Sequence, residues 1–421
     1  MNLIPVNIDS ILVGEPLPFH LLNKDGVLLA RKSFVVRSRD DLVDLSHRDG
    51  GIFIDGVDAE ALRRAYNDQL QTMLKEQQSL GVIARTRPSS QTFRMAEAIK
   101  KADIRGKEVI DGNTRIDWLD LQEQANFMLR DTNSLTFTER LDHIHEILGQ
   151  QIRRNPDGAL FALIYLSSTD THHYSATHSM LVSVMCGLAS REVLNWPDPV
   201  ESLLRKVALT MNMAMTDLQD KLAVQAKPPS AEQRLAIDEH STRSAALLQQ
   251  LGVTDAVWID AVGGHHQQTP GALRTKTPAQ RMARLVQRAD LFAARISPRA
   301  ARKPISPAAA MQACYFDENK QVDEAGAALI KAIGIYQPGA FVKLVTDEIA
   351  VVVRRGINTS TPKVAVLINR SGLPTMEPIV RDTSLKEYRI TASVPHRDVK
   401  LKINLEKTLL LTQSPQSDRA F

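Results

Sequence analysis

Apolar residues recur every three to four positions over most of the chain from residue 136 to residue 335. This spacing puts them on one face of each helix and predicts amphipathic helices that pack against one another. Residues typical of helix starts occur in the same stretch, at Thr136 ahead of Glu139, at Ser230 ahead of Glu232 and at Thr277-Pro278. The fold class is therefore expected to be mainly α, with a helical bundle as its largest part.

The two ends of the chain follow a different pattern, in which short runs of β-branched and aromatic residues alternate with turn residues. Strands are predicted near the N-terminus over residues 18–22, 27–36 and 51–55, with a short helix beginning at Ser38, and after Gly339 over residues 341–345, 349–354 and 364–368. The bundle is thus expected to be flanked by a small N-terminal α+β module and by C-terminal β-strands.

Shifts in composition along the chain predict five segments. They are the α+β module at 1–60, a helical and linker region at 61–130, the helical domain at 131–336, a C-terminal β-rich extension at 337–412 and a polar tail at 413–421. The polar run from Arg85 to Ser90 interrupts the second segment and is typical of a linker.

The overall composition is typical of a folded protein with several domains. Of the 421 residues, 43% are hydrophobic and 24% are charged, so a large core is expected. Aromatic residues make up only 5%, which leaves aliphatic side chains to fill the interior and favours helix packing. The formal net charge of +4 is not concentrated on one helix or face, and this argues against a nucleic-acid partner.

The cysteines and the N-terminus are those expected of a protein in a reducing compartment. Cys186 and Cys314 lie in apolar runs, as buried free thiols in a reducing compartment do. No apolar run reaches the roughly 18 residues of a membrane span, and the N-terminus lacks the basic and apolar regions of a secretory signal. We therefore expect a cytoplasmic protein without a membrane span.

Five side chains with metal-ligand chemistry stand on apolar faces or at an end of the predicted helices: His178, His240, His265, His266 and Asp290. Val182 and Met185, one and two turns after His178, place that histidine toward the core. Buried carboxylates and imidazoles need polar partners. For any one histidine a hydrogen-bonded core residue is the more common explanation. A divalent cation held among facing helices would satisfy all five together, and their occurrence in one helical stretch favours it.

Residues 170–310 resemble an HD-GYP domain, the family of metal-dependent phosphodiesterases that cleave cyclic di-GMP. The resemblance rests on motifs in the family's order: Tyr174-Ser-Ala-Thr-His178, the helix Ala208 to Met215, the capped helix from Ser230 to His240, the pair His265-His266, Ala289-Asp290-Leu291-Phe292 and Arg299-Ala-Ala-Arg302. It implies an HD-type helical bundle, metal ligands at the five side chains above, and phosphate contacts from Arg299 and Arg302.

Departures from the family pattern gather at the metal centre. Met211 stands where the family has a metal-binding His, Asn212 where it has the Asp that bridges two metals, and Met215 where it has a Lys near the phosphate. Gln267 replaces the Glu after the paired histidines, and Gln268–Leu273 replaces the Gly-Tyr-Pro loop. Two adjacent dications repel each other unless an anion lies between them, and a thioether is a poor ligand for iron or manganese. A two-metal site is therefore not expected.

A single metal remains open. The family resemblance implies that His240, His265 and His266 gather around one ion, and three histidines with an open water position are typical of catalytic zinc sites. The expected cofactor is thus one divalent ion, either iron, manganese or zinc, or none.

Three functions are open on these grounds. The first is a cyclic di-GMP signalling protein with impaired catalysis, which binds the nucleotide or a protein partner such as a diguanylate cyclase. The second is a phosphodiesterase or phosphohydrolase that acts on cyclic di-GMP or a related phosphoester through a reduced, histidine-rich metal site. The third is an interaction module without a nucleotide ligand. The replacement of the His-Asp pair by Met211-Asn212 favours the first, so an efficient enzyme is not expected.

Overall fold

A computed structural model describes residues 116–413 apart from gaps at 131–136, 170, 172, 301–303 and 402. Nearer the N-terminus it describes residues 3–6, 11, 13–14, 17, 19–24, 26–31, 34–41, 43 and 51–55, and the single positions 62, 66, 69, 73 and 92. The chain divides into two compact units, residues 1–115 and 116–421. The expected linker at 85–90 and the tail beyond residue 413 lie outside the described residues, and the finer segment boundaries stay predictions.

The N-terminal unit contains an antiparallel sheet with strand order β1-β4-β2-β3. The strands are β1 Leu3–Pro5, β2 Leu21–Leu22, β3 Leu28–Ala30 and β4 Phe53–Asp55. Buried apolar side chains such as Phe19 and Ile54 give this unit a core of its own. The strand expected over 27–36 is wrong in length, because a turn in which the Phe34 N–H donates to the Arg31 carbonyl follows β3.

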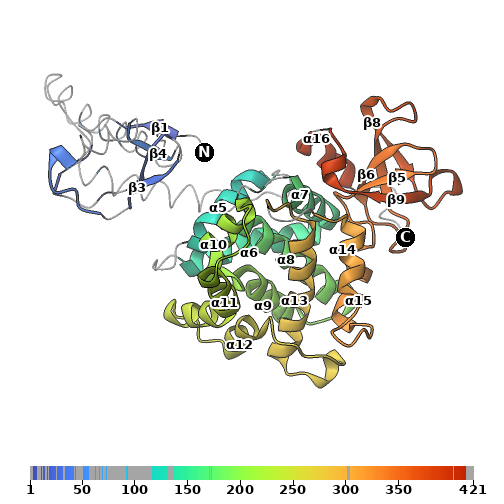
Figure 1. The fold of residues 1–421 in the computed structure, drawn as a ribbon, viewed down its shortest axis with the longest axis horizontal. Helices are drawn as coiled ribbons and strands as arrows, with labels where there is room; N and C mark the ends of the chain where they lie inside the picture. The colour runs from blue at the N-terminus through green and yellow to red at the C-terminus, as the bar shows by residue number, and fades with distance from the viewer. Residues whose placement is uncertain are drawn as a thin grey trace. The chain divides into compact units, whose positions relative to one another are not determined.

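The helices of the second unit form a bundle, which confirms the mainly α fold expected from the sequence (Figure 1). They are α5 Trp118–Arg130, α6 Phe137–Arg154, α7 Pro156–Thr169, α8 Tyr174–Leu188, α9 Asp198–Thr210, α10 Thr216–Val224, α11 Ala231–Gln250, α12 Ala256–Gly264, α13 Pro278–Ile296, α14 Pro307–Cys314 and α15 Glu324–Ile333. Ser230 and Thr277 cap α11 and α13 with reciprocal capping boxes, as hydroxyl residues at these starts predicted.

Helix α8 lies at the centre of the bundle. All of its residues are buried, and it contacts α5, α6, α7, α9, α10, α13 and α15. A helix that is covered on every side belongs in a core, where neighbouring helices exclude water from it. Its polar side chains, His178 among them, must therefore find their partners inside the bundle.

The C-terminal residues form a five-stranded antiparallel sheet with strand order β8-β7-β6-β5-β9. Its strands are β5 Phe341–Leu344, β6 Ile349–Arg354, β7 Lys363–Ile368, β8 Pro374–Asp382 and β9 Ile390–Val394, followed by the short helix α16 Leu405–Leu409. The sequence predicted β5, β6 and β7 to within one residue but missed β8 and β9. Strand β8 contains Pro374 and Pro378, which it tolerates because it is an edge strand, where missing N–H groups cost little.

This sheet is attached to the bundle by apolar packing and by one arginine. Phe161 of α7 packs in a cluster with Phe341 of β5 and other sheet residues. Arg355, directly after β6, donates to Asp157 at the start of α7 at 2.7 Å and to Glu192 after α8 at 2.6 Å. Burial raises the pKa of Asp157, and the charge of Arg355 counteracts that rise. The ion pair therefore holds the sheet against the helix that neighbours α8.

Both cysteines are buried free thiols, as the sequence predicted. Burial raises the pKa of both, that of Cys314 to about 12, so neither is a reactive thiolate near neutral pH. In the part of the chain that the structure describes, no helix combines the length and the apolar character needed to cross a bilayer.

His396 makes the stability of the C-terminal sheet sensitive to acid. Its ring is buried against Phe341, and its Nε2–H donates to the Gly339 carbonyl at 2.9 Å. Burial lowers its pKa from the ordinary 6.5 to about 4. The folded state therefore binds fewer protons than the unfolded state between these two pKa values. As a result the free energy of unfolding begins to fall as pH drops below 6.5 and stops falling near 4.

We expect His396→Gln, which keeps a hydrogen-bond donor but does not titrate, to remove this part of the acid sensitivity. Urea unfolding at pH 7.5 and pH 5.5 measures it. The parent protein should lose about 1 kcal/mol more than the variant between these two conditions. Equal losses in the two proteins would show that His396 is not buried in its neutral form.

Candidate metal centre

Three of the five predicted ligands come together where helices α11 and α12 meet. His240 lies in the middle of α11, His265 is the C-cap residue of α12, and His266 follows it. Each of the three rings offers a nitrogen that lies within 4.8 Å of those of the other two. His240 and His265 are buried, whereas His266 is exposed, so the cluster has one side that ligands can reach from solvent.

The hydrogen bonds of the two buried histidines determine which nitrogen carries the proton. His240 Nδ1 is bonded to the Ile237 carbonyl, and His265 Nδ1 is bonded to the Val262 carbonyl at 2.7 Å. A carbonyl oxygen only accepts, so both Nδ1 atoms carry hydrogen. In the neutral rings the lone pair is then on Nε2, and both helices present Nε2 to the interior of the cluster.

These two Nε2 atoms lie 3.3 Å apart. Burial lowers the pKa of His265 to about 3 and also lowers the pKa of His240, so both rings are neutral near pH 7. Two lone pairs that face each other repel unless a cation lies between them. Two nitrogens bound tetrahedrally to one zinc ion at about 2.0–2.1 Å would be separated by roughly 3.3 Å. The donor set therefore fits a single divalent ion.

His178 and Asp290 form a second pair beside this cluster. His178 Nε2 of α8 lies 2.7 Å from Asp290 Oδ1 of α13. Burial would raise the pKa of Asp290, but the hydrogen bond and the electrostatic interaction with His178 outweigh it, and the pKa falls below its usual range. Asp290 is thus an anion that lies close to the histidine cluster, while His178 contacts it from the central helix.

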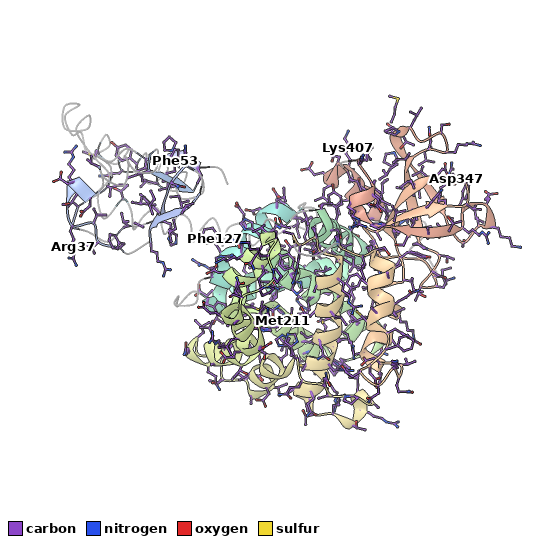
Figure 2. The ribbon with its side chains drawn as sticks, viewed as in Figure 1. Arg37, Phe53, Phe127, Met211, Asp347 and Lys407 are labelled. Atoms are coloured by element: carbon purple, nitrogen blue, oxygen red, sulfur yellow. The ribbon has the colours of Figure 1, made fainter. Side chains whose placement is uncertain are left out.

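Met211 and Asn212, which the family resemblance aligns with a His-Asp pair, are also buried. Met211, the C-cap residue of α9, is fully buried among the helices (Figure 2). The side-chain oxygen of Asn212 is buried without a hydrogen-bond partner. The Ala214 N–H donates to Ser244 Oγ on α11, one turn after His240, so this segment is attached to the helix that carries a cluster histidine. An amide oxygen that lacks a donor fits a cation better than an apolar core.

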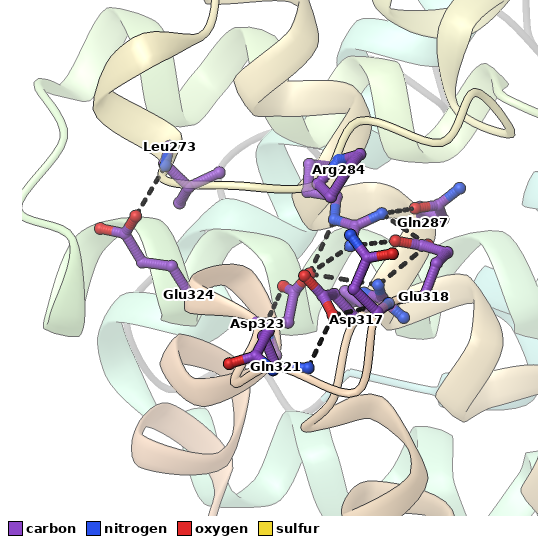
Figure 3. A network of polar contacts seen from close by, with 12 residues as sticks. Leu273, Arg284, Gln287, Asp317, Glu318, Gln321, Asp323 and Glu324 are labelled. Carbon is purple, nitrogen blue, oxygen red and sulfur yellow. Dashed lines mark hydrogen bonds and ion pairs between the residues drawn. The ribbon is translucent and has the colours of Figure 1, made fainter.

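The loop after the paired histidines is held in place by two side chains. Lys276 Nζ donates to the Pro270 carbonyl at 2.8 Å. The Leu273 N–H donates to Glu324 Oε2 of α15 at 2.6 Å (Figure 3). Beside it, Arg284 of α13 bonds to Glu318 and Asp323 in the turn before α15. Side-chain contacts therefore hold the loop between His266 and α13 in place.

Arg299, one of the two predicted phosphate contacts, follows α13. Its Nη2 donates to the Tyr174 hydroxyl at 2.6 Å, and its guanidinium carbon lies 5.1 Å from the centre of the Tyr174 ring. Its Nε is buried without a hydrogen-bond partner. Arg302, the other predicted contact, lies outside the described residues.

Sequence reasoning did not single out Tyr174 as a functional residue. Its ring stacks on that of His178, with centroids 5.7 Å apart and planes 18° apart. The signal was present, because the residue four positions before a helical histidine lies on the same face. The predicted roles of the five candidate ligands and of Arg299 stay predictions, to which the contacts above give a geometry.

Comparison with known proteins bears on this site. No protein-family model matches the chain. A cyclic di-GMP phosphodiesterase of Pseudomonas aeruginosa is 25% identical over 245 residues, which are 57% of this chain and 58% of the relative. The match thus spans less than two thirds of the relative's length. It supports the distant relationship to the HD-GYP family that the motifs indicate. Among solved structures, an HDG"Y"P protein from Bdellovibrio bacteriovorus matches 78% of this chain and 98% of its own at 14% identity, with a TM-score of 0.40.

We expect the purified protein to bind about one equivalent of zinc per chain, because the cluster presents three imidazole nitrogens to one point. Equilibrium dialysis with elemental analysis measures the stoichiometry. His240→Ala and His265→Ala should each weaken zinc binding by more than about tenfold. His143→Ala, which removes a histidine of α6 outside the cluster, serves as the control. Fewer than about 0.1 equivalents in the parent protein would exclude a metal centre here.

Proposed function

We propose that this chain, a distant relative of the HD-GYP proteins, is a cyclic di-GMP signalling protein that holds one divalent ion and has impaired catalysis. The observation that carries the proposal is the contrast within the site. The three histidines of the cluster point their donor atoms at one place, whereas the position of the bridging carboxylate is taken by Asn212. The site keeps what one ion needs and lacks what a second ion needs.

The ion would be bound by His240, His265 and His266. When bound, a divalent ion with an open position acts as a Lewis acid and lowers the pKa of a coordinated water. Asp290 supplies the negative charge nearby, and its hydrogen bond to His178 fixes its orientation. The exposed ring of His266 marks the side from which a ligand would approach.

Catalysis is impaired because the second half of the family's metal clamp is missing. A two-metal site stabilises both the attacking and the leaving oxygen of the phosphodiester. Such a site needs an anion between the two ions, and Asn212 is neutral. Met211 offers a soft sulfur, which is a poor ligand for iron or manganese.

Arg299 supports a phosphate ligand. Its guanidinium is half-buried, and among the residues that the structure describes no carboxylate is bonded to it. Its buried Nε–H lacks an acceptor. A guanidinium without a counter-ion is suited to phosphate oxygens, which accept its fork of N–H donors. Cyclic di-GMP is proposed as that ligand because the relative in Pseudomonas aeruginosa is a cyclic di-GMP phosphodiesterase.

A second candidate is a phosphodiesterase or related phosphohydrolase that works with the single ion. The separation of 3.3 Å between the two buried Nε2 atoms favours it, because a preorganised centre could activate water without a second ion. The proposed signalling protein would also bind a protein partner such as a diguanylate cyclase, because a regulator without efficient catalysis acts by binding other molecules.

We expect isothermal calorimetry to detect cyclic di-GMP binding by the zinc-loaded protein. Arg299→Ala should weaken that binding by about tenfold, because hydrogen bonds from a charged donor to phosphate are lost. Arg397→Ala removes an exposed arginine of the C-terminal part and should leave binding unchanged. If millimolar cyclic di-GMP produced neither heat nor a thermal shift, the chain would instead be an interaction module without a nucleotide ligand.

Restoring the family's pair tests the impaired catalysis. The double variant Met211→His, Asn212→Asp should bind about two equivalents of manganese and hydrolyse cyclic di-GMP at least about tenfold faster than the parent. Met211→Leu, which keeps the apolar volume, is the control. A parent protein as active as the double variant would contradict the proposal. If that activity were lost in His265→Ala, the single-ion phosphodiesterase would be the function.

A further inference from the structure

Tyr174 contacts both Arg299 and His178, the histidine that pairs with Asp290 beside the histidine cluster. It lies in the first turn of α8, four residues before His178, and only 3% of its surface is exposed. Its ring stacks on the His178 ring, while its hydroxyl accepts the hydrogen bond from Arg299. We propose that Tyr174 is a positioning residue that couples phosphate binding at Arg299 to the His178–Asp290 pair beside the histidine cluster. The inference rests on the proposed function and identifies how that site is regulated.

The contact between Arg299 and Tyr174 is preset by a neighbouring helix. Asp220 of α10 accepts the Ser175 N–H at 2.7 Å, which fixes the first turn of α8. Ala223, also of α10, accepts the Ala300 N–H at 2.9 Å, which fixes the segment after Arg299. Because one helix holds both backbones, the tyrosine and the arginine meet in a defined geometry before any ligand binds.

The contact is also one that a phosphate can change. Arg299 has five N–H donors, and the Tyr174 hydroxyl is a neutral acceptor that occupies one of them. A phosphate oxygen is a stronger acceptor for guanidinium than a hydroxyl is. A bound phosphate would therefore draw Arg299 toward itself and change the hydrogen bond that orients the tyrosine.

A change at Tyr174 reaches the cluster through two further contacts. The His178 ring is held on its face by Tyr174 and at Nε2 by Asp290, and its Nδ1 is buried without a hydrogen-bond partner. The stacked ring is thus one of two restraints on its orientation. Asp290, which His178 orients, lies near enough to the cluster to interact electrostatically with His265. Partners beyond the direct ligands of a metal affect its affinity by about 10–100-fold.

The test measures a coupling factor, defined as the ratio of the zinc dissociation constants without and with saturating cyclic di-GMP. We expect a factor of at least about five in the parent protein. Tyr174→Phe keeps the stacking but loses the hydroxyl, so it should weaken cyclic di-GMP binding by about tenfold and reduce the factor. Tyr174→Leu loses the stacking as well, so it should also weaken zinc binding by about tenfold and bring the factor close to one.

Tyr165→Phe, the same change in a tyrosine of α7 that packs on the C-terminal sheet, is the matched control and should behave as the parent does. Thermal unfolding of each variant separates loss of fold from loss of coupling, since a merely structural residue would lower the melting temperature and leave the factor unchanged. A parent with a factor of one, or a Tyr174→Leu protein that keeps the parent's factor, would overturn the inference alone. A parent that binds neither zinc nor cyclic di-GMP would overturn the proposed function, and the inference with it.

Discussion

The candidate centre depends on one electrostatic constraint, the approach of two neutral imidazole nitrogens whose lone pairs face each other at 3.3 Å. The backbone carbonyls of Ile237 and Val262 hold the protons on the opposite ring nitrogens, so neither histidine can relieve the repulsion by changing tautomer. Burial opposes protonation of either ring. A cation between them removes the conflict, and the helices α11 and α12 are packed in the arrangement that such a cation requires.

The same electrostatic reasoning applies to Met211 and Asn212, which the family resemblance aligns with a metal-binding His-Asp pair. One cation suits three imidazoles, but a second cation beside it needs an anion to offset their repulsion. The side-chain oxygen of Asn212 has no hydrogen-bond partner and carries no charge. Met211 is an apolar side chain buried in the core. In this chain Met211 is packed as a core residue, and neither it nor Asn212 supplies a negative charge.

The surrounding fold supplies rigidity at this point. Helix α8 is buried on all sides, so His178 cannot hydrogen-bond to bulk water and is bonded to Asp290 instead. The loop after His266 is fastened by Lys276 and by Glu324. Arg355 fastens the C-terminal sheet to the start of α7, which packs against α8. A site that is built on packed helices keeps its geometry better than one built on free loops.

The sequence by itself determined the helical bundle, the flanking strands β5 to β7 and the five candidate ligands, because apolar periodicity and ordered motifs are local properties of the chain. It could not determine β8 and β9, since both are edge strands that depend on the one neighbour that pairs with them, and β8 also contains prolines. The family resemblance implied that His240, His265 and His266 share one ion, but the sequence did not give the distances between them. The tertiary structure brought three histidines to one point, paired Asp290 with His178, and set Tyr174 between His178 and Arg299. Distances between side chains on different helices arise from packing, which no local pattern encodes.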